Sequence, residues 1–120
     1  MIAFNPQTIL LEPMLQSMDN PQKLITFAML NLGVIEALES GTSTPDEMVR
    51  HFYSANNGLY VRHRLKDDVA DEIMSRGVQL PDLFEALSET EASDAFRTEL
   101  ELMRSLALGI LRRDRTPIEP

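Results

Sequence analysis

The chain has 120 residues, the size of one domain, and carries a net charge of −8 from 19 acidic and 11 basic side chains. It contains no cysteine, which excludes disulfide bonds, thiolate zinc sites and cysteine nucleophiles. The acidic balance argues against broad affinity for nucleic-acid phosphates, because counterion release requires clustered Lys and Arg. We expect one helical domain over residues 1–120, with residues 114–120 as a frayed tail.

No membrane partner is expected. The longest uncharged run of the central apolar segment, residues 24–35, is far shorter than the roughly 20 residues that a membrane-spanning helix requires. The first residues lack a basic n-region and a small-residue cleavage site, so no signal peptide is predicted. These features predict a soluble, cytoplasmic protein.

The first apolar segment, residues 9–18, is interrupted by Pro13. A proline inside a helix removes a backbone hydrogen bond and crowds the preceding turn. We therefore expect either a kinked helix or two short helical pieces in this segment.

The segment from Asn20 to Gly41 predicts the central helix, near residues 21–40, with Asn20 as its cap and Ser40-Gly41 as its end. At about 100° per residue its apolar side chains cover well over half of the helix circumference. Such a helix has to be covered by its own chain, by a second copy or by a partner. The apolar residues are Leu24, Ile25, Phe27, Ala28, Leu30, Leu32, Val34, Ile35 and Leu38.

This wide apolar arc predicts self-association as a homodimer, with another protein as the alternative partner. The candidate interface residues are Phe27, Leu30, Asn31 and Val34. Asn31 lies inside the arc, where its amide either bonds to a loop carbonyl or water, or sets the register of a helix pair across a dimer axis. Gly33 lies on a narrow polar side, where it either faces solvent or allows a second backbone to approach closely.

The next elements are marked by local signals. Thr44, Pro45 and Glu47 form a capping box that starts a short helix ending near residues 56–58. Residues 59–76 are interpreted as a helix that Gly77 ends, although residues 59–64 also alternate as a short strand would. A short helix is expected after Pro81. The last helix is predicted from about residue 94 to residue 113, capped by Ser93. The fold class is therefore an all-α bundle of about five to six helices.

An acidic pattern provides the first candidate for catalysis. Carboxylates three or four residues apart share a helix face, and two such pairs that meet across a bundle can hold Mg²⁺. The spacing D-D-x-x-D followed by E-x-x-D resembles that of the all-α nucleotide pyrophosphohydrolases of the MazG type, although the first half here has Asp in place of Glu. This resemblance implies a Mg²⁺-dependent enzyme whose metal ligands are Asp67, Asp68, Asp71, Glu91 and Asp94.

A basic cluster provides the second alternative. Residues 34–53 have the rhythm of a helix-turn-helix and are similar to the opening of winged-helix regulators, which implies that residues 59–66 face a DNA groove. The cluster consists of Arg62, His63, Arg64 and Lys66. Acidic side chains follow it directly and would repel the phosphate backbone, so nucleic acid is not the expected partner.

The two histidines, His51 and His63, lie twelve residues apart and form no metal-binding helix motif. No catalytic residue, metal or cofactor is therefore assigned outside the Mg²⁺ alternative. The preferred interpretation is a small acidic helical protein that acts as a protein–protein interaction or regulatory module rather than as an enzyme.

Overall fold

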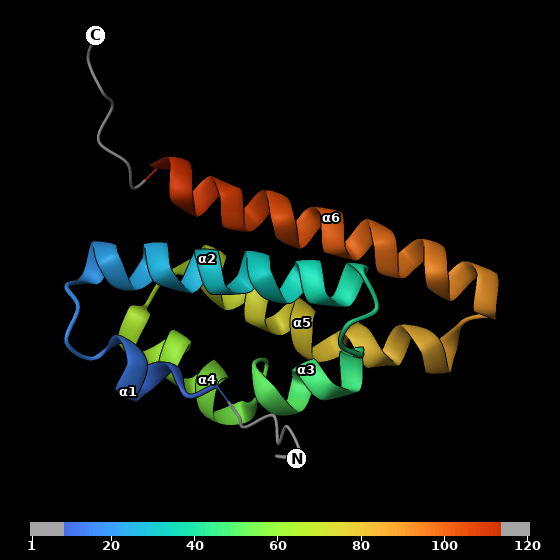
Figure 1. The fold of residues 1–120 in the computed structure, drawn as a ribbon, viewed down its shortest axis with the longest axis horizontal. Helices are drawn as coiled ribbons and strands as arrows, with labels where there is room; N and C mark the ends of the chain where they lie inside the picture. Colours follow the sequence, from blue (N-terminus) through green and yellow to red (C-terminus); the bar gives the residue numbers. More distant parts are fainter. Residues whose placement is uncertain (1–8, 114–120) are drawn as a thin grey trace, which may run out of the picture.

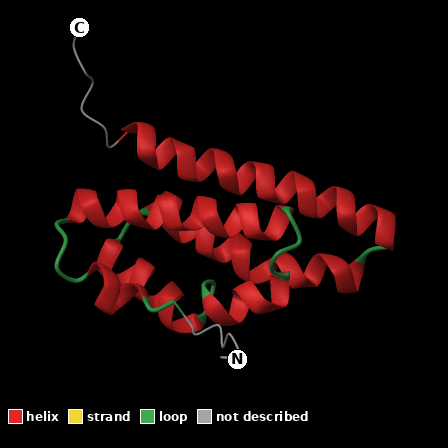
Figure 2. Cartoon of the chain, viewed as in Figure 1, coloured by secondary structure: helices red, strands yellow, loops and turns green. Residues whose placement is uncertain are grey.

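The fold is known from a computed structural model, which describes residues 9–113. In this range the chain forms six α-helices and one π-helix and contains no strand (Figures 1 and 2). The elements are α1 (Leu11–Leu15), α2 (Asn20–Glu39), α3 (Pro45–His51), α4 (Ala55–Tyr60), the π-helix η1 (Val61–Leu65), α5 (Asp68–Ala86) and α6 (Glu89–Arg113). The predicted all-α bundle is confirmed, whereas the predicted tail at 114–120 lies outside the described residues.

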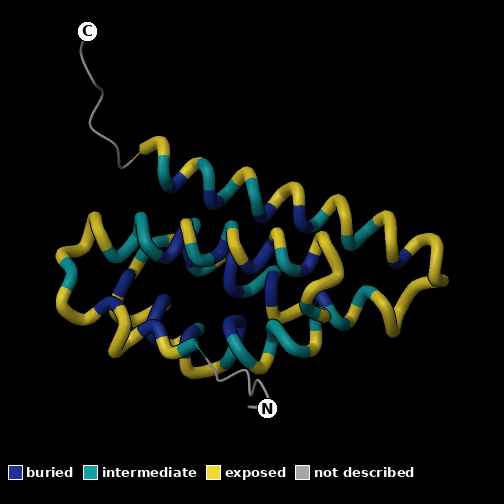
Figure 3. Tube along the Cα trace, in the orientation of Figure 1, coloured by how far each residue is buried: buried dark blue, intermediate teal, exposed yellow. Residues whose placement is uncertain are grey.

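The three long helices, α2, α5 and α6, contribute most of the buried apolar side chains of the core. In Figure 1, α2 and α5 lie between α6 on one side and the short helices α1, α3 and α4 on the other. Figure 3 shows the buried positions of these layers facing inward. Phe27 of α2 stacks on Phe52 at a ring-centroid distance of 6.0 Å, and Phe52 meets Tyr53 edge to face at 5.1 Å. These rings join α2 to the turn that links α3 and α4.

The caps of α2 and α3 follow from local sequence. Asp19, one residue before the predicted Asn20, caps α2, because its carboxylate accepts a hydrogen bond from the Gln22 backbone at 2.9 Å. After α2, Gly41 adopts φ +78°, a left-handed conformation that favours glycine. The capping box of α3 is confirmed: Thr44 Oγ1 accepts from the Glu47 backbone at 3.2 Å, and Glu47 accepts from the Thr44 backbone at 2.8 Å.

The first segment and the α3–α4 region differ from the prediction. Pro13 occupies the third position of a single five-residue helix, where a missing N–H costs little because first-turn donors have no acceptor within the helix. The helix that starts at the capping box ends at His51, and Asn57 lies inside a further helix, α4. Residues 59–65 are helical, so the strand alternative is excluded; they complete α4 and form η1.

Two predicted helix ends lie inside helices instead. Gly77 is in the middle of α5, and Pro81 follows four residues later in the same helix. The N–H that Pro81 lacks is the one that would bond to the Gly77 carbonyl, so the break costs one hydrogen bond while α5 continues to Ala86. The last helix begins at Glu89 rather than near residue 94. The predicted Ser93 does not cap this helix. The Ser88 hydroxyl oxygen instead accepts a hydrogen bond of 3.3 Å from the Glu91 backbone N–H in the first turn.

Candidate interaction surface

An apolar groove runs between α2 and α6. It has a volume of about 480 Å³ and is lined by Ile25, Met29, Leu32 and Leu111, which we call the α2–α6 face. Met29 is 60% exposed, the largest exposed fraction among the exposed large apolar side chains of residues 9–113. Single exposed apolar residues are ordinary, but here one lies in a groove whose walls are also apolar.

Gly33 lies one helical turn after Met29, on the same side of α2. It is exposed, and a Cβ atom added there would have no neighbouring atom within 4 Å apart from the helix itself and its chain neighbours. No contact within the described chain therefore requires a glycine. In the middle of a helix a glycine costs about 0.5–1 kcal/mol relative to alanine.

The structure places most of the predicted interface residues in the core. Phe27 and Asn31 are fully buried and Val34 is 7% exposed, while Leu30 is half-buried. Helix α6 is the main packing neighbour of α2. Of the apolar side chains of α2 only Met29 is exposed, whereas Ile25 and Leu32, which line the groove with it, are half-buried like Leu30.

Asn31 is held within its own chain. The Tyr53 hydroxyl donates a hydrogen bond of 2.7 Å to Asn31 Oδ1, so the partner is a phenol rather than a loop carbonyl. Burial raises the pKa of Tyr53 well above its usual range, which keeps this hydroxyl a donor. The Asn31 Nδ2 is buried and has no partner in the described part of the chain. The bond fixes the register between α2 and the turn after α3.

The acidic pattern is divided between two places. Asp67, Asp68 and Asp71 gather at the start of α5 around a cavity of about 190 Å³, together with Arg62 and Lys66. Asp67 accepts from the Ala70 backbone at 3.0 Å and pairs with Arg113, so it is a helix cap as well as an ion-pair partner.

The second half of the pattern lies elsewhere. Glu91 bonds to Ser88 at 2.8 Å, and Asp94 pairs with Arg97 at 3.8 Å. These residues begin α6 beyond the far end of α5, a 19-residue helix about 28 Å long. The chain therefore does not bring the five carboxylates together, and within residues 9–113 no three His or acidic side chains are grouped to hold a metal.

The basic cluster is also engaged with acids. Arg62 pairs with Asp71 at 3.4 Å, and Arg64 pairs with Glu12 at 3.4 Å. The basic cluster lies on the π-helix η1 and on Lys66, which caps its end. The described residues contain no strands that could form a wing. The geometry expected from the winged-helix resemblance is therefore not found in the part of the chain that the structure describes.

The two histidines lie apart from each other in the structure as well. The His51 carbonyl accepts from the Ile9 backbone at 2.7 Å, and its Nδ1 is buried with no partner among the described residues. His63 is exposed on η1 and lines a second cavity. They form no shared site.

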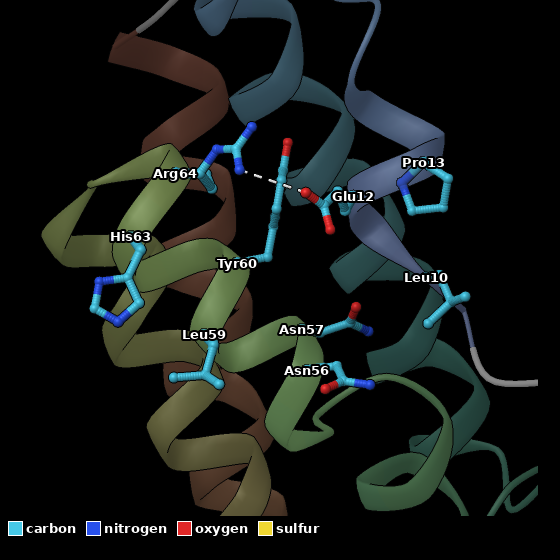
Figure 4. Close-up of a pocket in the computed structure, with 9 residues that line it drawn as sticks. All are labelled: Leu10, Glu12, Pro13, Asn56, Asn57, Leu59, Tyr60, His63 and Arg64. Atoms are coloured by element: carbon cyan, nitrogen blue, oxygen red, sulfur yellow. Dashed lines mark hydrogen bonds and ion pairs between the residues drawn. The ribbon is translucent and has the colours of Figure 1, made fainter.

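That second cavity was not predicted from the sequence. It has a volume of about 520 Å³ and lies between the start of α1, α4 and η1 (Figure 4). Tyr60 lines it and is 7% exposed, and its hydroxyl is buried without a partner in residues 9–113. Burial raises the pKa of Tyr60; Arg64 lowers it and Glu12 raises it further. The six residues of α4 are too few to carry a periodic signal that could have revealed this cavity.

The comparisons with known proteins give no family. No family model, no curated protein and no solved structure matches the chain. Among the described residues, no helix has the length and apolar character needed to cross a membrane.

Proposed function

We propose that this chain is a protein–protein interaction module that acts as a homodimer through the α2–α6 face. The observation that carries the proposal is the 60% exposure of Met29 in a groove with apolar walls. A two-fold axis that passes near Met29 would bring the same face of a second copy against it, as an isologous interface requires. Met29 lies at the middle of α2, so such an axis would pair the two helices along most of their length.

Gly33 is compatible with the same interface, although exposed Gly109 of α6 has equally open surroundings. An exposed glycine in the middle of a helix lowers helix stability, and nothing within the described chain compensates for it. A second helix backbone packed against this position would compensate, because only glycine allows the closest approach. Methionine suits such a contact as well, because its flexible and polarisable side chain adapts to the surface that it meets.

The proposed compartment is the cytosol. A chain with no cysteine gains no stabilising disulfide from an oxidising compartment. Its net charge of −8 keeps separate copies from aggregating and leaves basic proteins as possible further partners.

Met29→Glu is expected to convert the dimer into a monomer at micromolar concentration, because two desolvated carboxylates would then meet near the axis. The measurement is sedimentation velocity across a range of concentrations. Met14→Glu is the matched control, since Met14 is 44% exposed but lies on α1, away from the α2–α6 face. A wild-type protein that sediments as a monomer at every concentration, or a Met29→Glu variant that remains a dimer, would refute the proposal.

A further inference from the structure

The cavity between α1, α4 and η1 has the dimensions and composition of a small-molecule site. Its volume of about 520 Å³ lies within the range of roughly 300–1,000 Å³ typical of ligand pockets. Leu10, Pro13 and Leu59 provide apolar walls, and Arg64 and His63 provide basic groups. In Figure 4, Tyr60 lies between Arg64 and Glu12, with Pro13 and Leu10 on the side of α1 and with Leu59 and His63 on the opposite side.

Among the described residues the Tyr60 hydroxyl is a buried donor without an acceptor. Leaving such a group unpaired costs about 1–3 kcal/mol, so most buried polar groups in native proteins have a hydrogen-bond partner. Because burial raises the pKa of Tyr60, the hydroxyl stays protonated and can donate to an incoming oxygen. Asn57 lines the same cavity but does not accept this hydrogen bond; its amide oxygen accepts from the Leu11 backbone, and its Nδ2 donates to the Ile9 and Phe52 carbonyls.

Arg64 already holds one carboxylate at the edge of the cavity. Its ion pair with Glu12 is 3.4 Å long, and the two side chains are 63% and 58% exposed. Pairs as exposed as this contribute about 0–1 kcal/mol, so a competing carboxylate can displace Glu12 at little cost. Glu12 therefore shows which kind of group the Arg64 guanidinium accepts at this position.

The backbone that carries His63 and Arg64 is irregular. Val61–Leu65 form a π-helix, a rare element that occurs frequently at functional sites. Lys66, which ends it, has φ +53°, a left-handed conformation that a residue with a side chain adopts at a cost. The π-helix carries both His63 and Arg64, so this irregular segment supplies the basic groups of the cavity.

We propose that this cavity binds a small monocarboxylate with an apolar body, whose carboxylate replaces Glu12 beside Arg64 and accepts a hydrogen bond from Tyr60. The apolar body lies against Leu10, Pro13 and Leu59. A doubly charged phosphate fits less well, because Glu12 and a chain charge of −8 both oppose a second negative charge.

The test uses the full-length protein and hexanoate as the probe, followed by amide chemical shifts in NMR titrations. Hexanoate is expected to shift the signals of residues 59–66 in a saturable way, while hexan-1-ol and inorganic phosphate bind at least tenfold more weakly. Arg64→Gln is expected to weaken hexanoate binding at least tenfold, and Glu12→Gln to strengthen it several-fold because the internal competitor is gone. Arg97→Gln, which removes another exposed and ion-paired arginine, is the control and is expected to leave binding unchanged.

The Tyr60→Phe variant distinguishes an effect on hexanoate affinity from an effect on the stability of the fold. Since the hydroxyl has no partner in the described chain, its removal is expected to leave the stability of the free protein unchanged or higher, while hexanoate affinity falls about tenfold. Three results would overturn the proposal: equal binding of hexan-1-ol, tighter binding of phosphate, or unchanged hexanoate affinity in both Arg64→Gln and Tyr60→Phe.

Discussion

Asn57→Ala is expected to lower the free energy of unfolding by about 3 kcal/mol or more, because one side chain pairs three backbone groups. Asn57 Nδ2 donates to the carbonyls of Ile9 at 2.6 Å and Phe52 at 2.9 Å, and Oδ1 accepts from the Leu11 backbone at 3.0 Å. Alanine would leave these three groups unpaired, and each unpaired buried group costs about 1–3 kcal/mol. Through these hydrogen bonds Asn57 joins Ile9 and α1 to α4 and to the turn after α3.

Urea denaturation followed by circular dichroism measures the effect. Asn56→Ala is the matched control, because Asn56 is the exposed neighbour on the same helix and the change in side chain is identical. It is expected to change stability by about 0.5 kcal/mol or less, as surface substitutions usually do. Equal losses in the two variants would show that Asn57 does not hold α1 as described.

Gly77→Ala is expected to destabilise the fold by about 1–3 kcal/mol, although alanine favours helices by up to about 1 kcal/mol over glycine. Gly77 is buried in α5, and a Cβ atom there would overlap the ring of Tyr53. That ring cannot move aside cheaply. It is 1% exposed, packs on Phe52 and is fixed by its hydrogen bond to Asn31.

A double-mutant cycle tests this explanation through the free energies of unfolding. Tyr53→Leu removes the overlapping ring. In this background Gly77→Ala is expected to leave the free energy of unfolding nearly unchanged or to raise it, so the effects of the two substitutions are not additive. Gly109→Ala is the matched control, since Gly109 is an exposed helical glycine with open space around it, and it should stabilise by up to about 1 kcal/mol. A Gly77→Ala protein as stable as Gly109→Ala would contradict the packing described.

The fold class and the start of α3 could be predicted, because they depend on neighbours in sequence. The Thr44–Glu47 capping box needs only four residues, and its hydrogen bonds form as expected. Gly77 and Pro81 misled because both are common at helix ends, although both lie inside α5. At Gly77 the ring of Tyr53, distant in sequence, occupies the space that a Cβ atom would need. Local propensity is a weak guide wherever tertiary packing competes with it.

The surface of α2 also shows the limit of prediction from local sequence. Periodicity identified a helix with apolar residues over most of its circumference, and six residues of this helix are buried in the bundle. Periodicity could not tell which part of that arc the chain itself covers. Phe27 and Met29 lie only two residues apart, yet one is fully buried and the other is 60% exposed.

The most direct test of the proposed dimer is disulfide cross-linking between copies, which the cysteine-free sequence makes unambiguous. Met29→Cys places the only thiol of the chain near the proposed two-fold axis, so oxidation should join two copies rapidly at micromolar concentration. Met14→Cys places it on a comparably exposed surface outside the α2–α6 face. The account predicts fast cross-linking of the first variant and slow, concentration-driven cross-linking of the second. Equal rates in the two variants would contradict it.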